Sequence, residues 1–164
     1  MKLTAILLLF FILPFCCSAQ QSLVDVYKAK EFPCDSESGT IAINFCTSTK
    51  AEFADSLLNV VYRKLLSSIN KDIAADKKSL NQETAKGKKA DSLQLQMYRK
   101  NIDLNQRLKK SIIYSQQQWI KLRDANVDVA SIECEGGTGC IAMTNQAYID
   151  ETLERIQKLE SFLF

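Results

Sequence analysis

The chain has 164 residues, a net charge of +2 at pH 7 and no histidine. Without histidine it cannot build a Ser-His-Asp or Cys-His nucleophile, and every zinc site with an imidazole ligand is excluded. An all-cysteine zinc site stays open, but it usually needs cysteines separated by roughly two to four residues, which no pair after residue 20 shows. We therefore expect a non-enzymatic protein without a metal ion or a cofactor.

Residues 1–19 have the pattern of a secretory signal peptide, with one lysine, an apolar run of thirteen residues and a small-residue end. The apolar run is too short to cross a bilayer as a permanent helix. We expect cleavage after Ala19, which leaves a secreted or periplasmic domain of residues 20–164. A lipoprotein anchored through Cys16 or Cys17 is the alternative, but Phe15 or Cys16 would then occupy the preceding position, where lipidation needs a small residue.

Three long helices are predicted for the mature chain. Glycine and proline are scarce, at five and two residues, which argues for helices rather than a β-sandwich or barrel. Apolar residues recur three or four positions apart over residues 40–82, where Thr40 is the expected N-cap. Asp91 and Ser92 can cap a second long helix, and a third covers about residues 143–163. The glycine-rich residues 131–140 form the loop between the second and the third helix.

Each predicted helix has an apolar side that we expect to be buried. The expected core residues are Ile43, Ala51, Ala54, Leu58, Tyr62, Leu65, Ile69 and Ile73 in the first helix; Leu93, Met97, Leu104, Leu108, Ile112, Trp119 and Leu122 in the second; and Ile149, Leu153, Ile156, Leu159 and Leu163 in the third.

A polar stretch around Gly87 joins the first two helices, which must therefore run antiparallel as a hairpin. Residues that face each other then have numbers that sum to about 175–178. The pairs that this register predicts are Tyr62 with Ile112, Leu58 with Trp119, Asn59 with Gln116, and Asp55 with Arg123.

We interpret the polar members of these pairs as a network that fixes the register of the two helices. A polar binding pocket is the alternative. Breaking a buried pair of arginine and carboxylate typically costs about 3–5 kcal/mol. Asp55→Ala is therefore expected to destabilise the fold more than it affects binding.

The cysteines predict two disulfides. Four cysteines follow residue 20, and an even count in an exported chain indicates a disulfide framework with three possible connectivities. Proximity in sequence favours Cys34–Cys46 and Cys134–Cys140. The fold class is thus all-α: a long antiparallel helical hairpin and a C-terminal helix, stapled by disulfides.

The second cysteine pair brackets a glycine-rich acidic loop. A local disulfide would hold this loop rigid and so lower the entropy cost of binding. We expect the loop to contact a partner, although a tied-down connection without a partner is the alternative. The candidate binding residues are Glu133, Glu135, Gly136, Gly137 and Thr138.

Charge is unevenly distributed along the mature chain. Residues 60–123 carry fifteen basic and five acidic groups, net plus ten, whereas residues 124–164 carry two and eight, net minus six. Solvated helix faces are one explanation of this pattern. The alternatives are an acidic docking surface for a cationic partner and a basic arm that contacts an anionic polymer or a membrane. Aromatic residues do not interleave with the lysines, so we expect no nucleic-acid binding.

Four runs of the sequence, CDSESGTIAINFC, ADSLLNVVY, SQQQWIKLRD and TLERIQKLESFL, resemble in that order the N-terminal domain of the LprI-type lysozyme inhibitors, a family of exported bacterial domains. The matching residues are Cys34, Thr40, Cys46, Ala54, Asp55, Leu58, Asn59, Tyr62, Gln116, Trp119, Arg123, Asp124, Thr152, Arg155 and Leu159.

The chain departs from the family pattern in two places. It has Asn126 and Val127 where the family often has a cysteine, and residues 67–107 are longer than usual, which predicts an extended hairpin insertion. That insertion either projects as a two-stranded coiled coil or is partly disordered around residues 83–90.

The resemblance implies an exported, all-helical domain that inhibits a lysozyme. No second hydrophobic segment of the sequence approaches the length of a membrane span, so we expect no transmembrane segment in the mature chain. The alternative function is an interaction module of the cell envelope that binds another protein, a membrane surface or a wall polymer through the basic hairpin. The sequence leaves the oligomeric state and the class of lysozyme open.

Overall fold

The computed structural model describes residues 21–32, 34–36 and 38–163. Its described part is all-helical, which confirms the predicted fold class, and the expected signal peptide of residues 1–19 lies outside it. The elements in chain order are α1 (Leu23–Ala29), α2 (Thr40–Thr84), the 3-10 helix η1 (Gly87–Lys89), α3 (Ser92–Glu133) and α4 (Cys140–Glu160).

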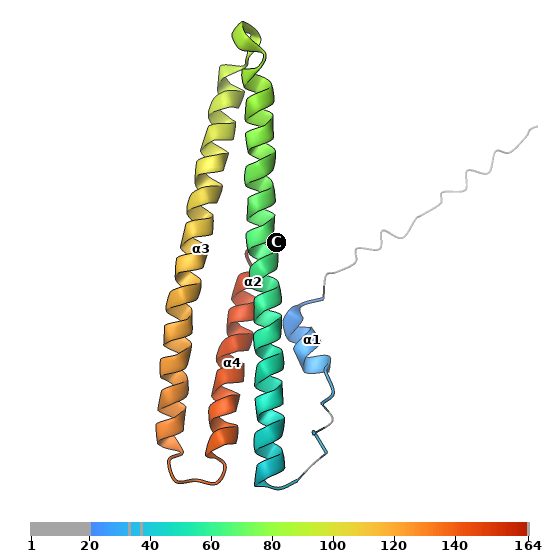
Figure 1. Cartoon of the computed structure of the whole chain (residues 1–164), viewed down its shortest axis with the longest axis vertical. Helices are drawn as coiled ribbons and strands as arrows, with labels where there is room; N and C mark the ends of the chain where they lie inside the picture. The colour runs from blue at the N-terminus through green and yellow to red at the C-terminus, as the bar shows by residue number, and fades with distance from the viewer. Residues whose placement is uncertain (1–20, 33, 37, 164) are drawn as a thin grey trace, which may run out of the picture.

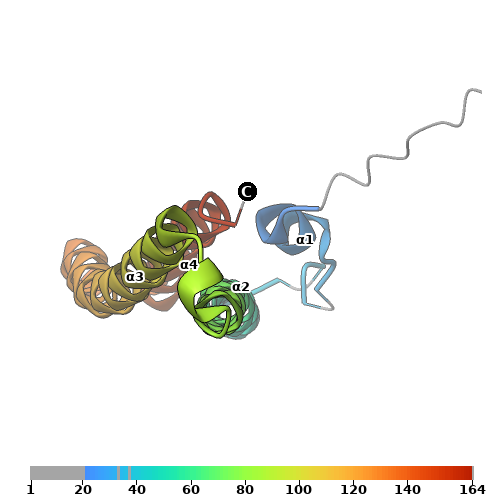
Figure 2. The same cartoon turned by 90° about the horizontal axis from the view of Figure 1, so that it is seen from above.

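The helices α2 and α3 form the predicted long antiparallel hairpin (Figure 1). Helix α4 packs against both of them, but only along the half of the hairpin where α2 begins and α3 ends. Helix α1 contacts α2 and α4, and the view from above shows it on the side of α2 opposite α3 (Figure 2). We call the end near residues 39–48 and 133–145 the base, and the end near residues 80–97 the tip.

The long helices α3 and α2 begin with different N-caps. Asp91 is the N-cap of α3, where its Oδ1 accepts from the backbone N of Leu93 at 2.8 Å. The expected N-cap of α2 is wrong, because Thr40 is already helical and Gly39 occupies the cap position with φ 104°. Glycine tolerates this positive φ, but it has no side chain with which to cap the helix.

The turn at the tip is ordered by one buried carboxylate. Glu83 is 5% exposed, and it accepts from the backbone N of Asp91 at 2.8 Å and pairs with the Nζ of Lys86 at 2.5 Å. These bonds hold the end of α2 and the 3-10 turn against the start of α3. Residues 83–90 are thus a structured turn rather than a disordered stretch.

The core lies in the half of the molecule nearer the base, where three long helices meet. Its buried residues are Leu57, Leu58, Val61, Leu65 and Ile69 of α2, Ile112 of α3, and Ile156 and Leu159 of α4. Tyr62, Ile73, Trp119, Leu153 and Leu163 are half-buried against this cluster.

Most of the apolar stripe predicted for the core side of the second helix is exposed instead. Leu93, Met97, Leu104, Leu108 and Leu122 are 39–64% exposed, and Ile43 of α2 is also exposed. The buried residues of α3 are Ile112, Gln116 and Arg123, because α4 packs on a polar side of this helix. Periodicity located an apolar side of α3 correctly but not the side that other helices cover.

Both predicted disulfides are present. Cys34 and Cys46 have Cα atoms 5.3 Å apart, and those of Cys134 and Cys140 are 5.0 Å apart. Both bonds lie at the base, where one ties the segment before α2 to its first turns and the other closes the connection between α3 and α4. No described helix is long and apolar enough to span a membrane.

Candidate functional site

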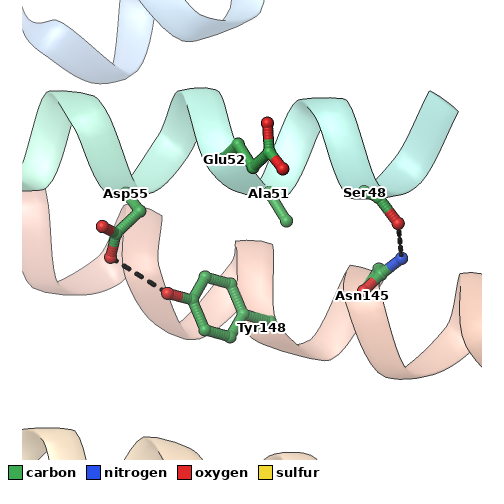
Figure 3. A pocket seen from close by; sticks show the side chains of 6 residues that line it. All are labelled: Ser48, Ala51, Glu52, Asp55, Asn145 and Tyr148. Carbon is green, nitrogen blue, oxygen red and sulfur yellow. Dashed lines mark hydrogen bonds between the residues drawn. The ribbon is translucent and has the colours of Figure 1, made fainter. Parts of the chain in front are cut away.

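A shallow polar groove of about 420 Å³ lies between α2 and α4 near the base (Figure 3). We call it the polar groove, and its lining residues are Ser48, Ala51, Glu52, Asp55, Asn145 and Tyr148. The Nδ2 of Asn145 donates to the Oγ of Ser48 at 2.9 Å, which joins the two helices at one end of the groove. The carboxylate of Glu52 is exposed and available to a ligand.

Tyr148 closes the other end of the polar groove and connects three helices. Its hydroxyl donates to the Oδ1 of Asp55 on α2 at 2.9 Å and accepts from the Nη1 of Arg123 on α3 at 2.8 Å. The guanidinium of Arg123 lies over the Tyr148 ring, 4.2 Å from its centroid. Burial and the hydrogen bond to Asp55 raise the pKa of Tyr148 to about 12.

Arg123 and Asp55 lie together as the hairpin register predicts. The Nη1 of Arg123 is 3.5 Å from the Oδ1 of Asp55, and its Nη2 is 3.0 Å from the Oδ1 of Asp124. The Asp55 side chain is 41% exposed and Arg123 has a second carboxylate. The loss of stability caused by Asp55→Ala should therefore be smaller than the loss typical of breaking a fully buried ion pair.

The predicted pair of Asn59 and Gln116 does not form. The Nδ2 of Asn59 donates to the Oδ2 of Asp55 at 3.0 Å within α2, and Asn59 is exposed. The Oε1 of Gln116 accepts from the Nε of Arg155 on α4 at 2.9 Å. The partner of Gln116 is thus Arg155 of α4, whereas the hairpin register of α2 and α3 alone predicted Asn59 of α2.

Arg155 is buried beneath Trp119. It is 9% exposed, its Nη2 donates to the Oγ of Ser115 at 3.0 Å, and its guanidinium lies 5.7 Å from the centroid of the Trp119 ring. Arg123 lies 5.1 Å from the same ring. Burial lowers the pKa of Arg155. Trp119 thus packs beside two guanidinium groups and against the core, which makes it a structural residue.

Leu58 and Trp119, and likewise Tyr62 and Ile112, belong to the same core region, as the register predicts. Tyr148, Asn145 and Ser48 are site residues that sequence reasoning missed. Tyr148 lies four and seven positions before the family-motif residues Thr152 and Arg155, so helical spacing would have placed it on their side of α4.

The acidic loop from Glu133 to Cys140 lies at the base. Its candidate binding residues, Glu133, Glu135, Gly136, Gly137 and Thr138, are all exposed. The backbone N of Gly137 donates to the O of Cys134 at 2.9 Å, and the N of Cys140 donates to the O of Gly137 at 3.2 Å. Gly136 has φ 80°, a conformation that favours glycine. The turn bonds and the disulfide restrain this loop.

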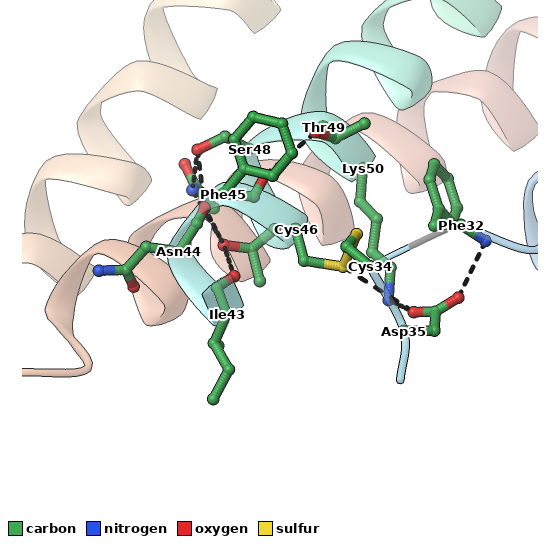
Figure 4. The surroundings of a disulfide bond; sticks show 12 residues. Phe32, Cys34, Asp35, Ile43, Asn44, Phe45, Cys46, Ser48, Thr49 and Lys50 are labelled. Atoms are coloured by element: carbon green, nitrogen blue, oxygen red, sulfur yellow. Dashed lines mark hydrogen bonds and ion pairs between the residues drawn. A yellow bond between two sulfur atoms is a disulfide. The ribbon is translucent and has the colours of Figure 1, made fainter. Parts of the chain in front are cut away.

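The other disulfide organises a second part of the base (Figure 4). Beside it, Asp35 accepts from the backbone N of Phe32 at 3.0 Å and pairs with Lys50 of α2 at 2.5 Å. The hydrogen bond from Lys50 and then that from Phe32 lower the pKa of Asp35. No described group of three potential metal ligands is placed to hold a metal ion.

The fold and the site together define a class: a helical binding domain whose base is stapled by two disulfides beside a polar groove. A family model described as "Lysozyme inhibitor LprI" matches residues 34–159, and the chain belongs to this family. The matched residues contain both disulfides, the polar groove and the acidic loop. No curated protein and no solved structure matches the chain.

Proposed function

We propose that this chain is an exported, non-enzymatic protein that binds and inhibits a lysozyme. Membership of the lysozyme inhibitor family carries this proposal, because the family match covers residues 34–159. The absence of histidine excludes a histidine-activated nucleophile, which supports a non-enzymatic role. The two disulfides and the pattern of residues 1–19 support a secreted or periplasmic location, with a lipoprotein as the alternative.

The acidic loop is the contact that we assign to the lysozyme. Lysozymes are commonly cationic, and residues 124–164 have a net charge of minus six, so electrostatic attraction would favour this end of the chain. Glu133 and Glu135 present charge, while Gly136, Gly137 and Thr138 present a narrow profile that fits a cleft. A restrained loop loses little conformational entropy when it binds.

Inhibition is tested in a cell-wall lysis assay with purified residues 20–164 and several types of lysozyme. The double variant Glu133→Gln/Glu135→Gln should weaken inhibition at least about threefold at low salt, and the difference should shrink as salt screens the charges. The matched control is Asp72→Asn/Asp103→Asn, which removes two exposed negative charges from the hairpin. This control should inhibit like the wild type.

Two results separate the site from the function. Inhibition by the wild type that is unaffected by the loop variant would exclude the loop as the contact. No inhibition of any lysozyme would exclude the function and favour the envelope module. In that case, binding to wall polymer or anionic vesicles should depend on the basic tip residues Lys88 and Lys89.

A further inference from the structure

Six of the nine exposed large apolar side chains of α3 lie along one side of the helix, and we call these six the α3 stripe. They are Leu93, Met97, Leu104, Leu108, Leu122 and Val129, with exposed fractions of 39–64%. At about 100° per residue they fall within an arc of about 60°. The buried residues of the same helix, Ile112, Gln116 and Arg123, point about 100° away. The α3 stripe is therefore a separate apolar side.

No described part of the chain covers the α3 stripe. Helix α4 packs on the other side of α3, where Arg155 reaches Gln116 and Tyr148 reaches Arg123. Single exposed apolar residues are normal on protein surfaces, but apolar patches mark interaction sites, and the stripe forms two of them, at residues 93–108 and 122–129. The stripe runs for about 54 Å along the helix, which suits another long helix better than a small ligand.

We propose that the occupant is a second copy of this chain, with the two α3 helices packed antiparallel about a two-fold axis. This inference goes beyond lysozyme inhibition and does not depend on it. In an isologous contact the facing residues have numbers with a constant sum. A sum of about 226 places Met97 against Val129 and Leu104 against Leu122, each pair twice. Small exposed residues, Ser111 and Ser115, lie at the axis and permit close approach.

Charge complementarity selects the antiparallel arrangement. The same register places the tip of one copy, with the exposed Lys88 and Lys89, beside the base of the other, with the exposed Glu133 and Glu135. A parallel pair would instead put Lys88 and Lys89 of the two copies side by side, and likewise Glu133 and Glu135. Like charges placed together oppose association.

The expected dimer is weak. A contact about 54 Å long and about 10 Å wide buries on the order of 1,000 Å² in total, near the lower limit for a specific interface. Leu93 and Leu108 meet the polar residues Glu133 and Gln118, so the contact is only partly apolar. We expect a dissociation constant in the micromolar range, on the order of 10 µM.

Sedimentation or light scattering of residues 20–164 between about 1 and 200 µM measures this equilibrium. Leu104→Glu/Leu122→Glu should raise the dissociation constant at least about tenfold, because the interface would bury charge against apolar residues. Both residues are more than half exposed, so the monomer should keep its circular dichroism spectrum. Ile41→Glu, at an 88% exposed apolar residue of α2, is the control and should dimerise normally.

Charge reversal tests the orientation. Lys88→Glu/Lys89→Glu and Glu133→Lys/Glu135→Lys should each weaken the dimer at low salt, and combining all four substitutions should restore it. A parallel dimer would not respond to either double charge reversal, because charges of the same sign would still lie opposite each other. A wild type that stays monomeric at 200 µM would overturn the proposal, even if the stripe bound vesicles or another protein. So would equal effects of the stripe variant and the Ile41→Glu control.

Discussion

Tyr148 joins three helices through one hydroxyl group, which donates to Asp55 and accepts from Arg123. These are charge-assisted bonds, which are roughly twice as strong as bonds between neutral groups. The ring also packs against the guanidinium of Arg123. Tyr148 therefore adds to the direct contact of Asp55 with Arg123 that the sequence predicted, and it fixes the positions of α2, α3 and α4 at the polar groove.

Tyr148→Phe should lower the free energy of unfolding by about 1–3 kcal/mol at pH 7, because Asp55 and Arg123 each lose a partner. The pH dependence should change too. The folded phenol keeps its proton up to its pKa of about 12, whereas an unfolded tyrosine ionises near pH 10. The unfolded state therefore binds fewer protons in this window, and wild-type stability falls as pH rises from about 10 to about 12.

Urea denaturation at a series of pH values, with phenolate absorbance to follow ionisation, measures both effects. The free energy of unfolding of Tyr148→Phe should fall less than that of the wild type as pH rises from about 10 to about 12, because the variant lacks this phenol. Tyr114→Phe is the matched control, since Tyr114 is 65% exposed and should unfold like the wild type. Equal stability of Tyr148→Phe and the control would mean that the hydroxyl does not hold the helices together.

At the scale of elements, the hairpin turn depends on Glu83. Hydrogen bonds from Lys86 first and then from the backbone of Asp91 hold the pKa of Glu83 below its usual range. The turn is thus stabilised above about pH 4.3, where an unfolded glutamate is ionised, and loses this contribution as pH falls further. Among the described helices only α2 and α3 reach the tip, so opening there is decoupled from the core.

Glu83→Ala should speed hydrogen exchange of the amides in residues 86–92 without shifting the midpoint of global thermal unfolding. The reason is that the carboxylate satisfies the N–H of Asp91 and restrains Lys86, while the core lies nearer the base. Exchange measured by mass spectrometry at pH 7 reports this local opening. The neighbouring exposed substitution Gln82→Ala should leave the exchange unchanged; similar acceleration in both variants would exclude a specific effect of Glu83.

Helix boundaries and apolar periodicity were largely predictable. Helices α2, α3 and α4 begin and end near the expected residues, because caps, glycines and a helical spacing are local signals. Helix α1 was missed, because its seven residues are too few to show a periodic pattern. It is held by tertiary contacts instead: the backbone N of Leu23 and the Oγ of Ser22 donate to Glu160 of α4 at 2.7 and 2.6 Å.

At the scale of the whole molecule, the two disulfides of the described residues both lie at the base, and neither restrains the tip. The chain-entropy model assigns roughly 2–3 kcal/mol to each, because the loops that they close span 12 and 6 residues. A reductant should therefore lower the free energy of unfolding by roughly 5 kcal/mol in total. Denaturant unfolding with and without reductant measures this change.

The control for reduction is the variant with alanine at all four cysteines, Cys34, Cys46, Cys134 and Cys140. It should be as unstable as the reduced wild type and should not respond to reductant. Equal stability of the oxidised and reduced wild type would show that the packing of α2, α3 and α4 holds the base together without the disulfides.

Local signals in the sequence were enough for the all-helical class, the antiparallel hairpin, the two disulfide pairs and the family. Each depends on residues close in the chain or on a spacing that one helix repeats. The partners of the polar side chains depend on the tertiary structure. Packing of α4 against both hairpin helices directed Gln116 to Arg155, placed Tyr148 between Asp55 and Arg123, and left the α3 stripe in solvent. Periodicity identifies the apolar side of a helix, but only its packed neighbours determine which side is covered.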